Sequence, residues 1–235
     1  MRAAVEIRPD FAAAWRRLGL ALAAERRWAE AEAALRQASK SEPDHAGTLA
    51  ALGMVLARQG RLDESIEVLR RVVGLRPDAV ESHMNLGAVL ADKERYEEAL
   101  EAFRRAAALR PAFGPARLYA GRALVDLRRY DDALAELAEA SRLLGGSADA
   151  ERLSGMALRR LGRHAEAAAA LRRSIDLQPR SDSAHEELAR ALLSLDQRDE
   201  AAASLKRAVA LNPRNTAATA TLLALLHRAG SDEVA

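Results

Sequence analysis

The stretch Val80–Phe113 carries two apolar stripes, each with the spacing of one helix face. The stripe positions are Leu86, Val89 and Leu90 in the first helix and Ala99, Phe103 and Ala106 in the second. Pro111 cannot continue a helix and marks the end of the second one. Each predicted helix has about 14 residues and is therefore roughly 20 Å long. Neither helix can bury its stripe alone, so the stretch predicts a helical hairpin that stacks on further hairpins.

This pattern recurs along the chain every 34 residues. The recurring columns are a proline (Pro9, Pro43, Pro77, Pro111, Pro179, Pro213), a glycine (Gly19, Gly53, Gly87, Gly121, Gly155) and a leucine (Leu22, Leu56, Leu90, Leu124, Leu158, Leu192, Leu226). The register predicts a single array of six full repeats, 12–45, 46–79, 80–113, 114–147, 148–181 and 182–215, between partial repeats 1–11 and 216–235.

The columns resemble those of the tetratricopeptide repeat. The first repeat carries the pattern almost whole, in Trp15, Leu18, Gly19, Leu22, Ala31, Leu35, Ala38 and Pro43. The resemblance implies an all-α fold, a right-handed superhelical solenoid of antiparallel helix pairs whose first helices line the inner face. It also implies a role in holding peptides, tails or helices of other proteins.

The glycine column needs a structural reason, because a glycine inside a helix costs about 1 kcal/mol relative to alanine. We expect each glycine to permit a close helix crossing. The predicted opposite surface is the small column of the second helices: Ala31, Ser65, Ala99, Ala133, Ala167 and Ala201.

Composition narrows the classes of function. The net charge of +2 does not favour nucleic-acid binding, and the absence of cysteine excludes disulfides and thiolate metal sites. No run of 18 apolar residues predicts a membrane span. The first residues show no apolar region of a signal peptide, which favours the cytoplasm, although the compartment stays open.

Two places depart from the repeat. Gly145, Gly146 and Ser147 stand where a proline is expected, which indicates either a glycine-capped turn or a softer hinge. The last helix carries Leu222, Leu223, Leu225 and Leu226 without the polar cap that arrays usually have. Either a further helix follows in a longer parent protein, or this surface mediates self-association.

We expect a partner-binding groove on the side of the first helices opposite the leucine stripe. The predicted groove residues are Leu20, Met54, Met84, Leu118, Arg122, Arg152, Met156, Arg159 and Arg190. The arginines are expected to be exposed and only partly neutralised by Asp126, Asp149 and Glu186. Methionine adapts to varied partners and arginine grips carboxylates, so the groove predicts a partner with acidic residues beside apolar anchors. The alternative is that these side chains only pack neighbouring repeats together.

Two ligand-binding motifs known from tetratricopeptide repeat proteins are largely absent from this sequence. Only Asn85 matches the peptide-gripping asparagine column of O-GlcNAc transferase, and no repeat has the lysine–asparagine pair that clamps chaperone tails. We find no catalytic motif and expect no metal or cofactor, since His83 and His185 share a column but lie three repeats apart. The paired arginines of the second helices, such as Arg70 and Arg71, are expected to be solvated.

The pattern and the resemblance predict a non-catalytic scaffold that binds a peptide or helix of a partner protein in its inner groove. The alternative is the targeting segment of a larger enzyme, such as a glycosyltransferase or sulfotransferase. A catalytic domain beyond Ala235 in the parent reading frame would favour that alternative.

Overall fold

The computed structural model describes residues 12–232, which form helices joined by short turns. The predicted partial repeat 1–11 and the last three residues lie outside this part. The first helices of the repeats are α2 (Ala12–Ala24), α4 (Ala46–Arg58), α6 (Val80–Asp92), α8 (Gly114–Asp126), α10 (Ala148–Arg160), α12 (Asp182–Ser194) and α14 (Thr216–Asp232). The second helices are α3 (Trp28–Ser41), α5 (Leu62–Leu75), α7 (Tyr96–Leu109), α9 (Tyr130–Leu143), α11 (His164–Leu177) and α13 (Arg198–Leu211). Both sets begin every 34 residues.

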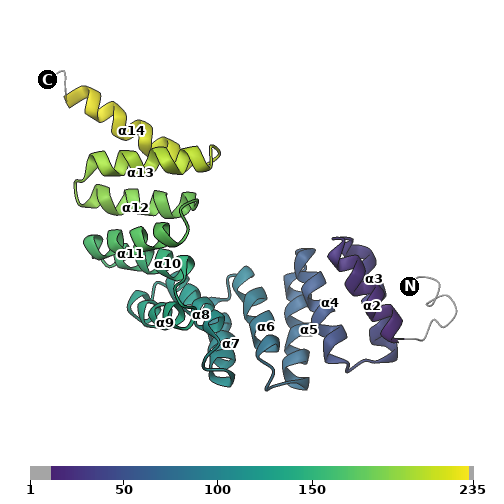
Figure 1. Cartoon of the computed structure of the whole chain (residues 1–235). Coiled ribbons are helices and arrows are strands. Elements are labelled where there is room, and N and C mark those ends of the chain that lie inside the picture. Colours follow the sequence, from purple (N-terminus) through teal and green to yellow (C-terminus); the bar gives the residue numbers. More distant parts are fainter. Residues whose placement is uncertain (1–11, 233–235) are drawn as a thin grey trace. The chain divides into compact units, whose positions relative to one another are not determined.

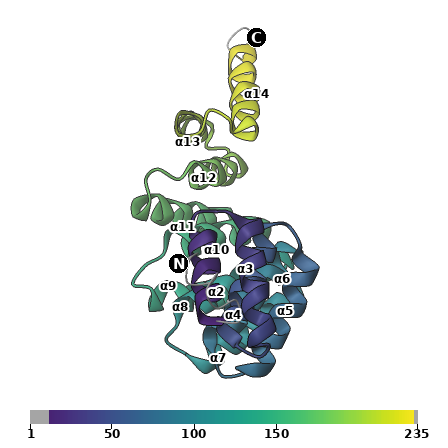
Figure 2. The same ribbon diagram turned by 90° about the vertical axis from the view of Figure 1, so that its right-hand side faces the viewer.

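The helices belong to two compact units, an N-terminal unit that ends at Pro111 and a C-terminal unit that begins at Ala112. Within each unit, consecutive helices lie side by side in chain order (Figures 1 and 2). In the described part of the chain, the substantial helix contacts join helices that are next to each other or next but one. The fold is an all-α helical repeat solenoid, as predicted. The unbroken sequence register does not mark the division at Pro111.

Each helical hairpin closes through one residue with left-handed backbone. These residues are Arg26, Gly60, Glu94, Arg128, Gly162 and Asp196, with φ between 57° and 78°. In the first repeat, the N–H of Arg27 donates to the carbonyl of Leu22 and the N–H of Arg26 to that of Ala23, which is the bond pair of a Schellman cap. Four of the six are not glycine, so glycine placement alone does not locate these turns in the sequence.

The glycine column lies at close helix crossings, as predicted, but the residues opposite differ from the prediction. A Cβ added to Gly19 would lie 2.6 Å from Cγ of Leu35, and one added to Gly87 would lie 2.6 Å from Cε1 of Phe103. The surface opposite the glycines is therefore the large side chain of the second helix. The small column is fully buried one turn earlier and contributes backbone, such as the carbonyl oxygen of Ala31 at 3.2 Å from the added Cβ.

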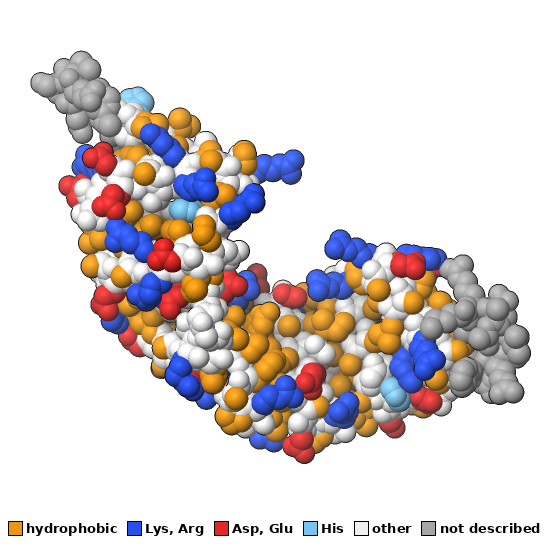
Figure 3. Space-filling model, in the orientation of Figure 1, with side chains coloured by type: hydrophobic (Ala, Val, Ile, Leu, Met, Phe, Trp, Pro, Cys, Tyr) orange, Lys and Arg blue, Asp and Glu red, His pale blue; other side chains and the backbone are white. Residues whose placement is uncertain are grey.

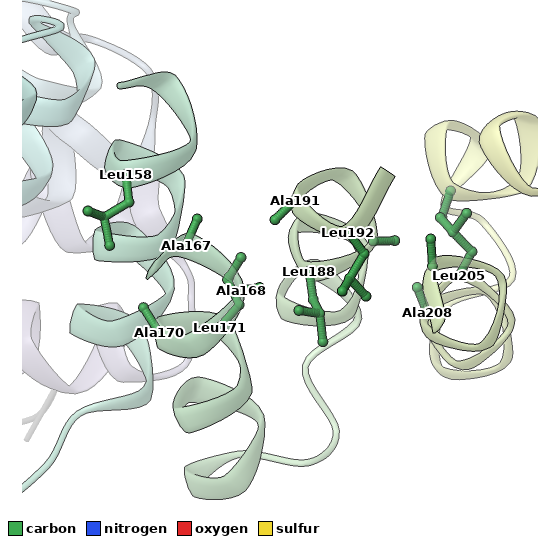
Figure 4. Packing of buried hydrophobic residues seen from close by; sticks show 13 residues of the cluster. Leu158, Ala167, Ala168, Ala170, Leu171, Leu188, Ala191, Leu192, Leu205 and Ala208 are labelled. Carbon is green, nitrogen blue, oxygen red and sulfur yellow. The ribbon is translucent and has the colours of Figure 1, made fainter. Parts of the chain in front are cut away.

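Buried apolar side chains of the first and second helices form the core of each unit. In the C-terminal unit, buried side chains of α11, α12 and α13 lie on the sides of these helices that face one another (Figure 4). Leu192 of α12 is 1% exposed and Leu205 of α13 is fully buried. On α14 the equivalent leucine, Leu226, is 46% exposed, and Leu223 is 63% exposed. No helix of the described part covers this apolar face.

The departure after α9 is a complete glycine cap. Gly145 and Gly146 have φ values of 67° and 104°. Their N–H groups donate to the carbonyls of Arg142 and Ser141, and the hydroxyl of Ser147 then accepts from the N–H of Ala150 at the start of α10. The turn therefore satisfies its backbone groups in the manner expected of a cap.

Candidate partner-binding surface

We define the first-helix face of a unit as the surface of its first helices that points away from the second helices. In the N-terminal unit this face contains a hollow of about 450 Å³. Its lining residues are Leu20, Ala23, Trp28, Gly47, Ala50, Ala51, Met54, Val55, Arg58 and Asn85. In Figure 3, apolar side chains of this unit form patches broken by single charged side chains. We call this cavity the α2–α4 hollow, because most of its lining comes from these two helices.

The hollow follows from small residues at inward positions of α4. Gly47, Ala50 and Ala51 lie within two successive turns, at positions where other repeats carry larger side chains, such as Leu118 and Tyr119 of α8. Leu20, which is 49% exposed, and Met54 stand beside this floor. The structure thus brings two predicted groove residues together around one cavity. Met84 is half-buried on α6, whereas its neighbour Asn85 reaches the hollow.

Two arginines on the first-helix face of the N-terminal unit are exposed and form no ion pair within the described part of the chain. Arg58 lines the hollow one turn beyond Met54, and Arg17 lies one turn before Leu20. Nearby Arg16 instead pairs with Glu42, Nη1 to Oε2, at 3.2 Å. The apolar hollow therefore lies beside unneutralised positive charge.

In the C-terminal unit, the structure corrects the prediction of exposed, partly neutralised arginines for Arg152 and Arg159. The side chains of Arg152 and Arg159 are only 22% and 18% exposed. Arg152 bonds Asp149 at 3.2 Å and the sulfur of Met156 at 3.4 Å, and Arg159 bonds Glu187 at 3.0 Å. These arginines hold neighbouring side chains in place and carry little free charge.

Arg190 completes an ion network on α12. Its guanidinium bonds Glu187 at 2.6 Å and also Glu186, while Glu187 is only 7% exposed. Asn215, in the turn before α14, donates to Glu186 at 2.8 Å and to Asp182 at 3.4 Å. Hydrogen bonds from Asn212 and Asn215 lower the pKa of Asp182 against the opposing effect of burial. Glu187 was not among the predicted neutralising residues, because its column carries no charge pattern in the other repeats.

The remaining predicted residues of this unit lie on α8. Arg122 is exposed, and Leu118 is half-buried. Partial burial raises the pKa of the Asp126 carboxyl, although the charge of Arg122 acts in the opposite direction. The helix α8 belongs to the C-terminal unit, whereas the α2–α4 hollow belongs to the N-terminal unit.

Several arginines of the second helices pair with carboxylates of other helices. Arg70 bonds Glu98 at 2.6 Å, and Arg172 bonds Glu200 at 2.8 Å, in the same register. Arg71 bonds Asp44 at 2.6 Å, and Arg173 bonds Glu151 at 2.8 Å. Solvated side chains were predicted here, and the structure adds ion-pair partners, which lie in the neighbouring repeat for Arg70, Arg71 and Arg172 and in the same repeat for Arg173.

His45, His83 and His185 have structural partners. His83 and His185, which share a column, each donate from Nε2 to a proline carbonyl, of Pro77 at 2.8 Å and of Pro179 at 3.2 Å. His45 caps α4 by accepting from the N–H of Thr48. Among residues 12–232, no three His, Cys, Asp or Glu side chains gather closely enough to hold a metal ion. No helix of that part is long and apolar enough to cross a membrane.

Sequence reasoning missed part of the hollow. Trp28 belongs to a second helix and was not considered for the inner surface, yet it closes one side of the cavity. The sequence did contain a signal for it, because Gly47, Ala50 and Ala51 are all small and leave open space on this face of the helix.

Antiparallel helix pairs, a constant period and a helix face with an open hollow define a helical repeat scaffold. Profiles of the tetratricopeptide repeat match residues 1–46, 24–79, 50–112 and 118–182, and a second profile of that repeat matches residues 158–230. The chain belongs to the tetratricopeptide repeat family, and in general terms it is a protein-interaction scaffold. No curated protein matches the chain.

Solved structures share the fold. The Cut9–Hcn1 hetero-tetramer of the APC/C contains a chain with a TM-score of 0.74 and 18% identity, over 96% of this chain and 45% of that one. This protein thus spans less than half of that chain's length. PilF of Pseudomonas aeruginosa has a TM-score of 0.74 and 19% identity, over 89% of this chain and 96% of its own. YrrB, described as a TPR protein with an unusual peptide-binding site, has a TM-score of 0.62 and 21% identity, over 80% of this chain and 96% of its own.

Proposed function

We propose that this protein is a non-catalytic scaffold that binds a peptide or helix of a partner protein on the first-helix face of its N-terminal unit. The observation that carries the proposal is the α2–α4 hollow, whose floor is small and apolar. Its volume of about 450 Å³ falls within the range of ligand pockets, roughly 300–1,000 Å³. The peptide-binding site stated for YrrB, which has the same fold, supports this kind of ligand.

The hollow has features that suit a protein segment. Met54 can adjust its flexible side chain to different apolar anchors. Asn85 supplies an amide that can donate to and accept from a peptide backbone. By comparison, the first-helix face of the C-terminal unit is occupied by the ion network of Arg159, Glu187 and Arg190.

A filled-hollow variant tests this proposal. A photo-crosslinking residue at Met54 captures partners, and Ala50→Trp is introduced to occupy the cavity. We expect the crosslinked partner to disappear in Ala50→Trp and to persist in Ala33→Trp, which changes an exposed alanine of α3 in the same unit. A partner that crosslinks equally in Ala50→Trp would overturn the proposal.

We also propose that α14 mediates self-association with a second copy of this chain. Leu223 occupies the glycine column, where a second helix of the usual kind brings its leucine against the first helix. A leucine at this position prevents an ordinary second helix from approaching to that distance. A second α14 related by a two-fold axis would instead present the same apolar residues to each other.

Sedimentation equilibrium over a range of protein concentrations tests the self-association. We expect a concentration-dependent dimer that is lost when Leu223 and Leu226 are both changed to Lys. Leu177→Lys, at a leucine of the same unit that is 52% exposed, serves as the control and should leave the dimer intact. A wild-type protein that remains monomeric at every concentration would refute this second proposal.

A further inference from the structure

We propose that the α2–α4 hollow selects a partner segment in which an acidic residue lies beside a bulky apolar residue. This inference rests on the proposed function and adds the chemistry of the ligand. The sequence predicted that arginines of the C-terminal unit bind the acidic residue of the partner. Here that role is assigned to Arg17 and Arg58 of the N-terminal unit.

The apolar part of the recognition comes from shape. Gly47, Ala50 and Ala51 leave the floor open, and Leu20 and Trp28 flank it. Burying one large apolar side chain here removes its surface, and that of the exposed Leu20, from water. Burial of apolar surface is favourable in proportion to the area removed from water. An apolar anchor on the partner is therefore the first requirement.

The acidic part comes from free charge. Arg58 and Arg17 are exposed and have no ion-pair partner in residues 12–232, so no intramolecular bond must break before they bind a carboxylate. In contrast, Arg159 and Arg190 already bond Glu187, and a ligand would have to displace it. A guanidinium binds a carboxylate through two parallel hydrogen bonds, which fixes the ligand's orientation as well as its charge.

The register of the helices places these charges around the hollow. Arg17, Ala51 and Asn85 occupy the same position of α2, α4 and α6, so the cation, the apolar floor and the amide follow one another across three adjacent first helices. Arg58 lies two turns beyond Ala51 on α4. Asp92 holds the position of Arg58 on α6 and is exposed without an ion pair in the described residues. Its charge disfavours a long acidic run across all three helices and favours a single acidic residue close to the anchor.

The test uses a displayed library of short random peptides, selected on the full chain. We expect the selected peptides to carry Asp or Glu within one helical turn of a large apolar residue. Binding of a selected peptide, followed by fluorescence anisotropy, should weaken about tenfold or more in Arg17→Glu/Arg58→Glu and should weaken with added salt. Arg58→Lys should lose part of the affinity, because lysine keeps the positive charge but cannot form the two parallel hydrogen bonds to a carboxylate.

Two matched variants separate the inference from the proposed function. Arg180→Glu reverses one charge at an exposed arginine of the C-terminal unit and should leave affinity unchanged. Ala50→Trp should abolish binding of every selected peptide. If the selected peptides are neutral or basic, or if they are acidic and insensitive to Arg17→Glu/Arg58→Glu, the inference is wrong. In either case the proposed function survives as long as Ala50→Trp still abolishes binding, and both fail if it does not.

Discussion

The ring of Phe103 in α7 fills the space that a side chain on Gly87 of α6 would need. A Cβ on Gly87 would lie 2.6 Å from Cε1 and 2.8 Å from Cδ1 of this ring. Phe103 is 1% exposed and has little room to move. We therefore expect Gly87→Val to lower the free energy of unfolding by about 1–3 kcal/mol, through overpacking, in denaturant titrations.

Gly74 provides the control for that substitution. It also lies in a helix, α5, but no atom comes within 4 Å of an added Cβ. Gly74→Ala should be neutral or should stabilise by up to about 1 kcal/mol, as helix propensity predicts. A Gly87→Val variant as stable as the wild type would contradict the close crossing.

Truncations in the core test the packing of the same repeat. Leu90 is 2% exposed and Phe103 is 1% exposed. Each change to Ala should cost about 2–5 kcal/mol, because it removes buried surface and leaves a cavity. Leu177→Ala, at a side chain that is 52% exposed, should cost far less. A loss of under about 1 kcal/mol for either core variant would argue against the assigned register.

The charge reversal Arg190→Glu should destabilise the fold as well as change its surface. It would place a third carboxylate beside Glu186 and the buried Glu187, leaving only Arg159 to neutralise Glu187. We expect a loss of about 1–3 kcal/mol in denaturant titrations, less than for a fully buried charge without a partner. Arg180→Glu should change stability by less than about 0.5 kcal/mol. Equal stability of the two variants would show that the network contributes little.

Acid should weaken the N-terminal unit through Glu32. Burial raises the pKa of this carboxyl, but hydrogen bonds from Arg36 at 2.8 Å and Arg61 at 2.7 Å outweigh burial and lower it below its ordinary value. A lowered folded-state pKa stabilises the fold above the unfolded pKa of about 4.3, and this contribution is lost as the pH falls through the folded-state value. Stability measured from pH 6 downwards should therefore fall less steeply in Glu32→Gln than in the wild type (about one proton fewer is involved). Glu67→Gln, at an exposed residue of α5, should keep the wild-type slope.

The turn after α9 should behave as a cap in hydrogen exchange. The N–H groups of Gly145 and Gly146 both donate to carbonyls of α9. Their exchange should be no faster than that of Arg76, whose N–H bonds the carbonyl of Val72 at the end of α5. Distinctly faster exchange at the two glycines would support the hinge that the missing proline also allowed.

The sequence predicts the helices well because the same pattern of small and apolar positions recurs in each repeat. The columns of Gly87, Leu90 and Phe103 identify the hairpin, its crossing and the family. They do not identify the partner of the glycine, because spacing alone does not tell whether Ala99 or Phe103 stands opposite it. Nor do they show the ion partners of Arg152 and Arg159, which depend on side-chain positions in adjacent helices. Of these features, the hollow was the hardest to predict, because it is the space that small side chains leave open.

The restriction of helix contacts to near neighbours in the chain has a consequence for how this protein folds. Contacts of short sequence separation close small loops, so each hairpin can form quickly and serve as a template for the next. Loss of structure can then begin locally and spread one repeat at a time, without a single barrier for the whole chain. In the C-terminal unit, α14 packs mainly on α13 and leaves Leu223 and Leu226 in water, so unravelling of that unit should begin there.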